Sequence, residues 1–217
     1  MEKRMRKLFA NTTLALALLG AADAHAGPAE DYAAGSAAYR VGDVRGAIAK
    51  LRPGADAGDA RSQALLGSLL ERDEDAVHYL KLAAEQGNAD GAYGLAGKYA
   101  AGEGVKKSPD EARRWMVRAA AAGHPDARNA LAQAFLSGGL GVSEEERRSP
   151  GALEWLRPAA EAGFLPAMDR MVLAYRKGEF GLAVDQKLAA DLEAKAKAIR
   201  GANSKGRARA TGKDPRG

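Results

Sequence analysis

The serines, which could act as nucleophiles, do not have the neighbours that such chemistry requires. A serine held in a sharp strand-to-helix turn needs a glycine two residues away on each side. Ser143 has Gly141 before it, but Glu145 stands where the second glycine would be. No serine is followed three residues later by a lysine, which is the spacing of the penicillin-binding and β-lactamase nucleophile. Serine hydrolase chemistry is therefore not expected.

A phosphate-binding loop is incomplete as well. The run 94–98 ends in Gly97 and Lys98, but Ala92 occupies the position of the first glycine and Tyr99 that of the final hydroxyl residue. We expect Gly97 and Lys98 to lie inside a helix.

Metal ligands are scarce. Beyond residue 26 the chain has two histidines, His78 and His124, and it has no cysteine, whereas a structural zinc site needs four nitrogen or sulfur ligands in local pairs. His124 follows Gly123 and is interpreted as a polar turn residue. The glutamates at 144–146 are consecutive and do not alternate like calcium-loop ligands, so we interpret 144–148 as a solvated loop insertion. The sequence predicts a protein that is not an enzyme and has no metal or cofactor.

A repeated spacing dominates the rest of the chain. Four glycines, at intervals of 29, 36 and 40 residues, each have Ala three residues before, a large apolar residue eight after, and an aromatic residue or Leu twelve after. A period of this length indicates a solenoid. The four sets are Ala55, Gly58, Leu66 and Leu70; Ala84, Gly87, Leu95 and Tyr99; Ala120, Gly123, Leu131 and Phe135; and Ala160, Gly163, Met171 and Tyr175.

The residues around each glycine predict two helices. Asp110–Ala122 carries apolar residues at three- and four-residue spacing, including Trp115 and Met116, which is typical of a helix with one buried face. Gly123 can end that helix in a left-handed conformation. Leu131 and Phe135 then belong to a second helix. Each unit is a helical hairpin that buries its apolar faces only by stacking on its neighbours.

These runs resemble the Sel1-like repeat family. The resemblance lies in residues 76–90 and 99–105, in Trp115 and Trp155, each eight residues before a glycine, and in the glycine-rich loops at 138–142 and 178–182. It covers about Gly42 to Arg200. It implies an all-α fold, a right-handed α-solenoid of stacked antiparallel hairpins. It also implies an exported bacterial protein that acts as an adaptor, an envelope regulator or a host-interaction factor.

The chain ends divide the sequence further. Basic residues at 3–7, an apolar run from Leu14 to Ala22 and the Ala24-His25-Ala26 pattern predict a secretory signal peptide over 1–26, cleaved after Ala26. An uncleaved membrane anchor is disfavoured because the apolar run is short. We expect a capping helix over 27–41, about four hairpins plus a last capping helix at about 186–200 within 42–201, and a disordered tail over 202–217. The localisation is expected to be periplasmic or secreted.

The basic charge is concentrated in that tail. The whole chain carries a net charge of +5, and the tail alone carries +4, from five basic residues against Asp214. The tail either keeps the protein soluble or contacts an anionic polymer, an anionic lipid or an acidic protein. Nucleic acid is not expected, because the tail has no aromatic residue for base stacking. The basic residues are Lys205, Arg207, Arg209, Lys213 and Arg216.

The leftover helical surface carries the candidate binding residues. Trp115 and Trp155 recur at one repeat position, where Tyr79 also stands, so we interpret them as packing residues. In the first helix of each hairpin, the positions nine and six before the glycine should face a partner on the concave surface or simply face solvent. We expect a non-enzymatic scaffold that binds another protein there, or alternatively an envelope protein that binds glycan or anionic polymer through its tail. The candidate residues at these positions are His78, Lys81, Arg114, Glu154 and Arg157, and Arg118 is added because it lies one turn beyond Arg114.

Overall fold

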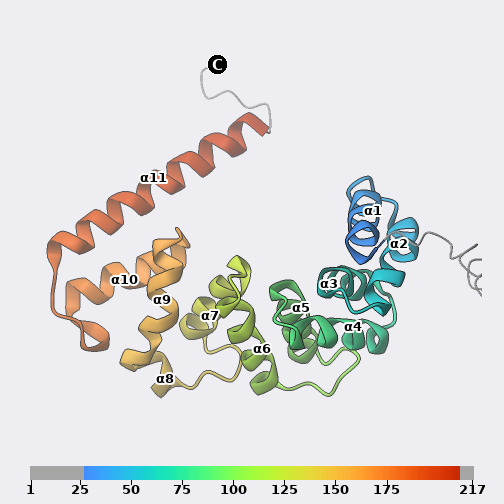
Figure 1. Cartoon of the computed structure of the whole chain (residues 1–217). Helices are drawn as coiled ribbons and strands as arrows, with labels where there is room; N and C mark the ends of the chain where they lie inside the picture. The colour runs from blue at the N-terminus through green and yellow to red at the C-terminus, as the bar shows by residue number, and fades with distance from the viewer. Residues whose placement is uncertain (1–26, 211–217) are drawn as a thin grey trace, which may run out of the picture.

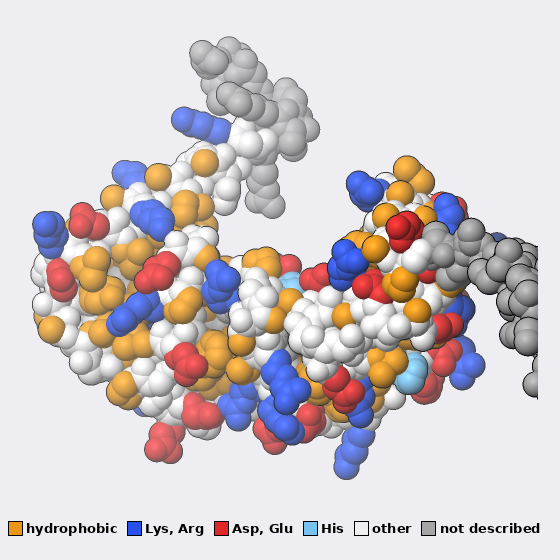
Figure 2. Space-filling model, in the orientation of Figure 1, with side chains coloured by type: hydrophobic (Ala, Val, Ile, Leu, Met, Phe, Trp, Pro, Cys, Tyr) orange, Lys and Arg blue, Asp and Glu red, His pale blue; other side chains and the backbone are white. Residues whose placement is uncertain are grey.

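The structure, a computed structural model, describes residues 27–210 and consists there of helices without any strand. The predicted all-α solenoid is confirmed: hairpin follows hairpin in an arch, with α1 near one end and α11 at the other (Figure 1). The space-filling view shows the surface hollowed between these two ends (Figure 2). The helices are α1 (Pro28–Arg40), α2 (Val44–Asp56), α3 (Ala60–Leu69), α4 (Asp73–Glu85), α5 (Ala89–Ala101), α6 (Pro109–Ala121), α7 (Pro125–Ser137), α8 (Glu144–Arg148), α9 (Leu153–Glu161), α10 (Leu165–Lys177) and α11 (Gln186–Ala210), with 3-10 turns at Pro150–Ala152 and Glu179–Gly181.

The repeated glycines form the turns between helices, as predicted. Gly123 lies between α6 and α7 with φ +93°, a conformation that a residue with a side chain adopts only at a cost. Its equivalents Gly58, Gly87 and Gly163 have φ between +83° and +94°. Most of the helices that follow are started by a polar side chain that accepts a hydrogen bond from the backbone, such as Asn88 from the amide of Gly91 at 2.8 Å.

The apolar residues at the repeated positions form the core. Leu66, Leu95, Leu131 and Met171 are buried, with at most 1% of their surface exposed. The residues twelve positions after each glycine, Leu70 or an aromatic residue, pack against these clusters, and so do Trp115 and Trp155. Gly97 and Lys98 lie within α5, as expected.

The helices form two layers, and the layers differ in how closely their members approach. Helices α1, α3 and α5 contact one another in turn, and α7 contacts α10, whereas the alternating helices α2, α4, α6 and α9 pack mainly on members of the first set. In a curved array, neighbouring helices approach most closely on the inside of the curve. We therefore call α1, α3, α5, α7 and α10 the inner helices, and α2, α4, α6 and α9 the outer helices.

Two expectations about loops and ends are corrected by the structure. Residues 144–148 are not a solvated loop but the short helix α8, which begins at a reciprocal hydrogen-bonded cap between Ser143 and Glu146. The tail expected to be disordered from 202 is helical as far as Ala210, because α11 continues without a break. Alanine, lysine and arginine favour helix, and Gly201 and Gly206 do not interrupt it. Residues 211–217, like 1–26 with the predicted signal peptide, lie outside the described residues.

Neither a membrane-spanning helix nor a metal-binding cluster occurs within residues 27–210. No helix there combines the length and the apolar character needed to cross a membrane. The same residues contain no group of three or more His, Cys, Asp or Glu side chains placed to hold a metal ion.

Candidate functional site: a tyrosine-lined groove on the inner helices

A groove of about 520 Å³ crosses the inner helices α1, α3 and α5. We call it the inner groove. Tyr32 and Tyr39 reach it from α1, seven residues apart and so on one face of the helix. Arg61 and Leu65 come from α3, and Tyr93 comes from α5. The groove therefore spans three successive inner helices and presents three tyrosines.

Its floor is the side chain of Leu80, which comes from the outer helix α4. Two glycines make room for it: a Cβ at Gly67 or at Gly94 would lie 2.8 Å from a Leu80 side-chain carbon. Any larger residue at these positions would push Leu80 away or separate α3 and α5 from α4. The groove thus owes its depth to small residues on α3 and α5.

One rim of the groove is fixed by the ion pairs of Lys98. Its Nζ lies 2.6 Å from Asp73 Oδ1 and 2.9 Å from Glu103 Oε2. The hydrogen bond to Asp73 raises the pKa of Lys98 above its ordinary value; burial opposes this shift and Glu103 adds to it. Lys98 therefore remains charged and holds the start of α4, the end of α5 and the loop after α5 together.

A second rim is built around His124. Its Nδ1 accepts the hydrogen bond of the Ala127 amide at 3.3 Å and starts α7, as expected of a polar residue in this turn. The ring stacks on Tyr93 with centroids 4.2 Å apart and 14° between the planes. Its Nε2 lies 3.5 Å from Asp90. His124 is a structural residue that orients Tyr93.

The tyrosines give the inner groove its binding chemistry. The Arg61 guanidinium lies 4.7 Å from the Tyr32 ring centre, which holds that ring in place. Tyr39 is 48% exposed. Within residues 27–206, whose side chains are described, the hydroxyls of Tyr32, Tyr39 and Tyr93 make no hydrogen bond to another protein group. They are free to bond the backbone of a partner while their rings cover its apolar side chains.

The residues chosen from the sequence lie elsewhere. All six are exposed, on α4, α6 and α9, which are outer helices. The expectation that they line the concave surface is corrected: the glycine spacing marks the turn between an outer helix and the next inner one, so the first helix of each sequence unit is an outer helix. The structure brings Arg114 and Arg118 together in one groove and leaves the other four, His78, Lys81, Glu154 and Arg157, apart from it.

The positions of three tyrosines in the sequence could have indicated the inner groove. Tyr32, Tyr39 and Tyr93 occupy positions outside the repeated glycine, alanine and aromatic set. Aromatic residues at non-repeated positions are not needed to stack one hairpin on the next, so they are candidates for binding. Only the arrangement of the helices in two layers shows which of these aromatic residues share a groove.

The tail residues divide between described and undescribed parts. Lys205 is exposed near the end of α11. Arg207 and Arg209 belong to the same helix, but their side chains lie outside the described residues, as do Lys213 and Arg216. Arg200, just before them, is bound to both carboxylate oxygens of Asp169 at 2.5 Å.

Comparison with known proteins agrees with this repeated architecture. The family model of the Sel1 repeat matches residues 60–88, 89–124 and 125–164. The protein carries three Sel1 repeats. Each begins at an inner helix, α3, α5 or α7, and so pairs an inner helix with the outer helix that follows it. The Sel1 repeat generally mediates protein–protein interactions and typically serves as a non-enzymatic scaffold.

Two solved structures are similar to this chain. One is c5321, a protective antigen of uropathogenic Escherichia coli with an SLR fold, at 24% identity and TM-score 0.66, covering 79% of this chain and 38% of that one. The other is a Sel1 repeat protein from Oxalobacter formigenes, at 29% identity and TM-score 0.60, covering 71% and 45%. The chain thus spans less than half the length of each. No curated protein matches the sequence.

Proposed function

We propose that this Sel1 repeat protein is a non-catalytic scaffold of the bacterial cell envelope that binds an extended segment of a partner protein in the inner groove. The observation that carries the proposal is the set of three tyrosines that α1 and α5 present to one groove. Tyrosine is enriched at binding hot spots because its ring and hydroxyl offer both apolar contact and a hydrogen bond. Export to the periplasm rests on the predicted signal peptide alone.

The construction of the groove also favours binding. The ion pairs of Lys98 and the stacking of His124 on Tyr93 hold both rims before a partner arrives. A preformed surface loses little conformational entropy when it binds, so more of the contact energy becomes affinity. The partner is thus placed on the concave side, as expected from the sequence, but it contacts residues of the inner groove and not the six candidate residues of the outer helices.

Photocrosslinking in cells tests the groove directly. The photoreactive residue p-benzoylphenylalanine replaces Ser68, an exposed residue of the inner groove, and in a matched variant it replaces Lys81, exposed on the outer helix α4. We expect a discrete crosslinked product from position 68 and none from position 81. Crosslinking from position 81 alone would overturn the proposed face.

A point variant tests the role of the tyrosines. Tyr39→Ala removes an exposed ring, so the fold should tolerate it, and capture of the crosslinked partner should fall by roughly tenfold, as for an interface hot spot. His78→Ala on α4 is the control and should leave capture unchanged. Equal capture by both variants would contradict the assignment.

A further inference from the structure

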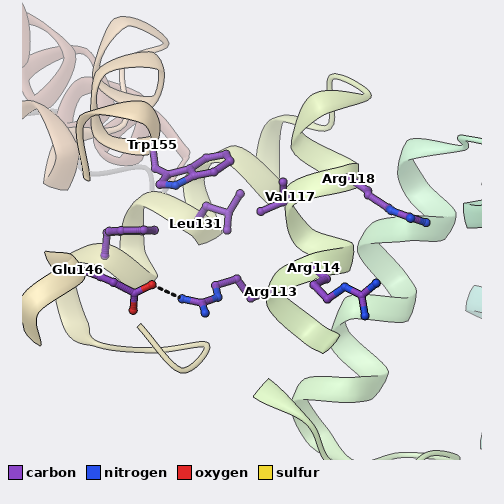
Figure 3. Close-up of a pocket in the computed structure, with 8 residues that line it drawn as sticks. Arg113, Arg114, Val117, Arg118, Leu131, Glu146 and Trp155 are labelled. Carbon is purple, nitrogen blue, oxygen red and sulfur yellow. Dashed lines mark hydrogen bonds and ion pairs between the residues drawn. The ribbon is translucent and has the colours of Figure 1, made fainter. Parts of the chain in front are cut away.

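A second groove, of about 430 Å³, lies on the outer side of the array between α6, α7 and α9. We call it the outer groove. Figure 3 shows its apolar part, where Trp155 of α9, Leu131 of α7 and Val117 of α6 lie around one space. Phe135 completes this part, stacked on Trp155 with ring centres 6.4 Å apart and planes inclined by 29°. The space is lined on three sides by apolar side chains and suits one large apolar side chain.

The edge of the outer groove nearest α8 is closed by an ion pair. Arg113 Nη1 lies 3.0 Å from Glu146 Oε1, across the lower part of the view in Figure 3. Each of these two charges neutralises the other. The charge that is left for a ligand therefore comes from the other side of α6.

That side carries Arg114 and Arg118, one helical turn apart and directed away from Trp155, with Val117 on the ridge between (Figure 3). The Arg114 side chain is 69% exposed, and among the residues whose side chains are described it pairs with Glu111 of its own helix, at 2.5 Å. Arg118 lies over the Trp115 ring at 4.7 Å and has no carboxylate partner among the residues whose side chains are described. The two guanidinium groups form a positive site beside an apolar one.

We propose that the outer groove binds a linear acidic segment of a second protein, in which a large apolar side chain is followed within a few residues by two carboxylates. The apolar side chain occupies the space between Val117, Leu131 and Trp155. The chain then crosses the α6 ridge at Val117, and the carboxylates meet Arg114 and Arg118. Arginine suits this role because its planar guanidinium binds a carboxylate through two parallel hydrogen bonds.

This site is separate from the inner groove. The inner groove lies on α1, α3 and α5, whereas the outer groove is made by α6, α7 and α9, and the two have no lining residue in common. One protein could then hold two partners at once. The proposal does not depend on the inner groove binding anything.

Synthetic peptides test the proposal. The probe is a fluorescein-labelled peptide with Phe-Glu-Glu between glycine and serine residues, and binding is followed by fluorescence anisotropy and by amide and indole chemical shifts of the protein. One control peptide has Gln in place of both Glu residues, and the other has Ala in place of Phe. We expect saturable binding below about 1 mM, as for a short linear motif, and at least about tenfold weaker binding of either control. Shifts should appear at Val117, Leu131 and the Trp155 indole.

Protein variants localise the binding. Arg114→Gln combined with Arg118→Gln should weaken the Phe-Glu-Glu peptide by roughly tenfold or more, since both charge-assisted contacts are lost. Lysine at both positions should restore part of the affinity. Arg148→Gln, on an equally exposed arginine of α8 outside the groove, should have no effect. Absence of binding, equal binding of the Gln peptide, or shifts confined to the inner groove would each overturn the proposal.

Discussion

Removal of the Arg147 side chain should destabilise the protein far more than removal of its neighbour Arg148. The last carbonyl groups of a helix have no partner within the helix and need one from elsewhere. Arg147 supplies it for α7: Nε donates to the Phe135 carbonyl at 3.1 Å and Nη2 to the Leu136 carbonyl at 2.5 Å. The short helix α8 thus holds the end of α7.

The size of the effect follows from exposure. The Arg147 side chain is 31% exposed, so each of its two charged hydrogen bonds contributes about 1 kcal/mol, below the range of about 1.5–3 kcal/mol for hydrogen bonds to charged groups. Arg147→Ala should therefore cost about 2 kcal/mol of unfolding free energy, or about 4–8 °C in melting temperature for a chain of this length. The Arg148 side chain is 78% exposed, and among the described residues its ion pair is with Glu144, so Arg148→Ala should cost less than about 0.5 kcal/mol.

Urea denaturation followed by far-UV circular dichroism measures both changes. Hydrogen exchange adds a local measurement: protection of the last turn of α7 should fall in Arg147→Ala and remain in Arg148→Ala. Arg147→Lys should lie between them, because lysine keeps the charge but not the fork of donors. Equal losses in the two alanine variants would refute the assignment of α8 as the support of α7.

Three further results are expected. The pKa of Lys98 is raised in the folded state, so its pairing with Asp73 stabilises the protein below the ordinary lysine pKa, and this stabilisation is lost as the pH rises through the folded pKa. Lys98→Met should therefore reduce the loss of unfolding free energy at alkaline pH. An unchanged dependence of the unfolding free energy on pH would contradict this. Gly104→Ala should lower the unfolding free energy by more than about 1 kcal/mol, because φ is +68° and the new Cβ would lie 2.4 Å from the Asp73 backbone. In the same urea titration, Gly97→Ala should raise the unfolding free energy by about 0.5–1 kcal/mol, because Gly97 is exposed inside α5. Truncation of residues 202–217 should change the unfolding free energy by less than about 1 kcal/mol, since no atom lies near a Cβ at Gly201 or Gly206. Loss of partner capture in that variant would indicate that the tail, and not the grooves, binds the partner.

The repeat pattern predicted the local structure because each of its residues acts locally. A glycine such as Gly123 is needed where the chain must turn with a positive φ. A large apolar residue such as Leu131 recurs eight residues after the glycine because that position faces the core. The predicted turn role of His124 also depended only on its neighbours in sequence. Such requirements depend on short stretches of sequence, so the turns and the buried positions of the repeat could be predicted.

Charge and end effects were harder to interpret. Arg147 and Arg148 look alike in the sequence, yet one caps a helix twelve residues away and the other faces solvent. The helical extension of α11 to Ala210 was missed because a basic segment without apolar residues is also typical of disorder. The role of Arg147 depends on the groups that lie near it in space. The helical conformation of the segment up to Ala210 depends on continuity with the first half of α11, which is already anchored.

The sequence by itself determined that this protein is a helical repeat array without the motifs of a known catalytic site. The tertiary structure decided which helices face inward. Both helices of a hairpin carry buried apolar residues, and the order helix, glycine, helix does not reveal which of them lies on the inside of the curve. That depends on the relative spacing of successive helices, set by close contacts such as those of Gly67 and Gly94 with Leu80. The same packing joined Tyr32 and Tyr39 of α1 and Tyr93 of α5 into one groove.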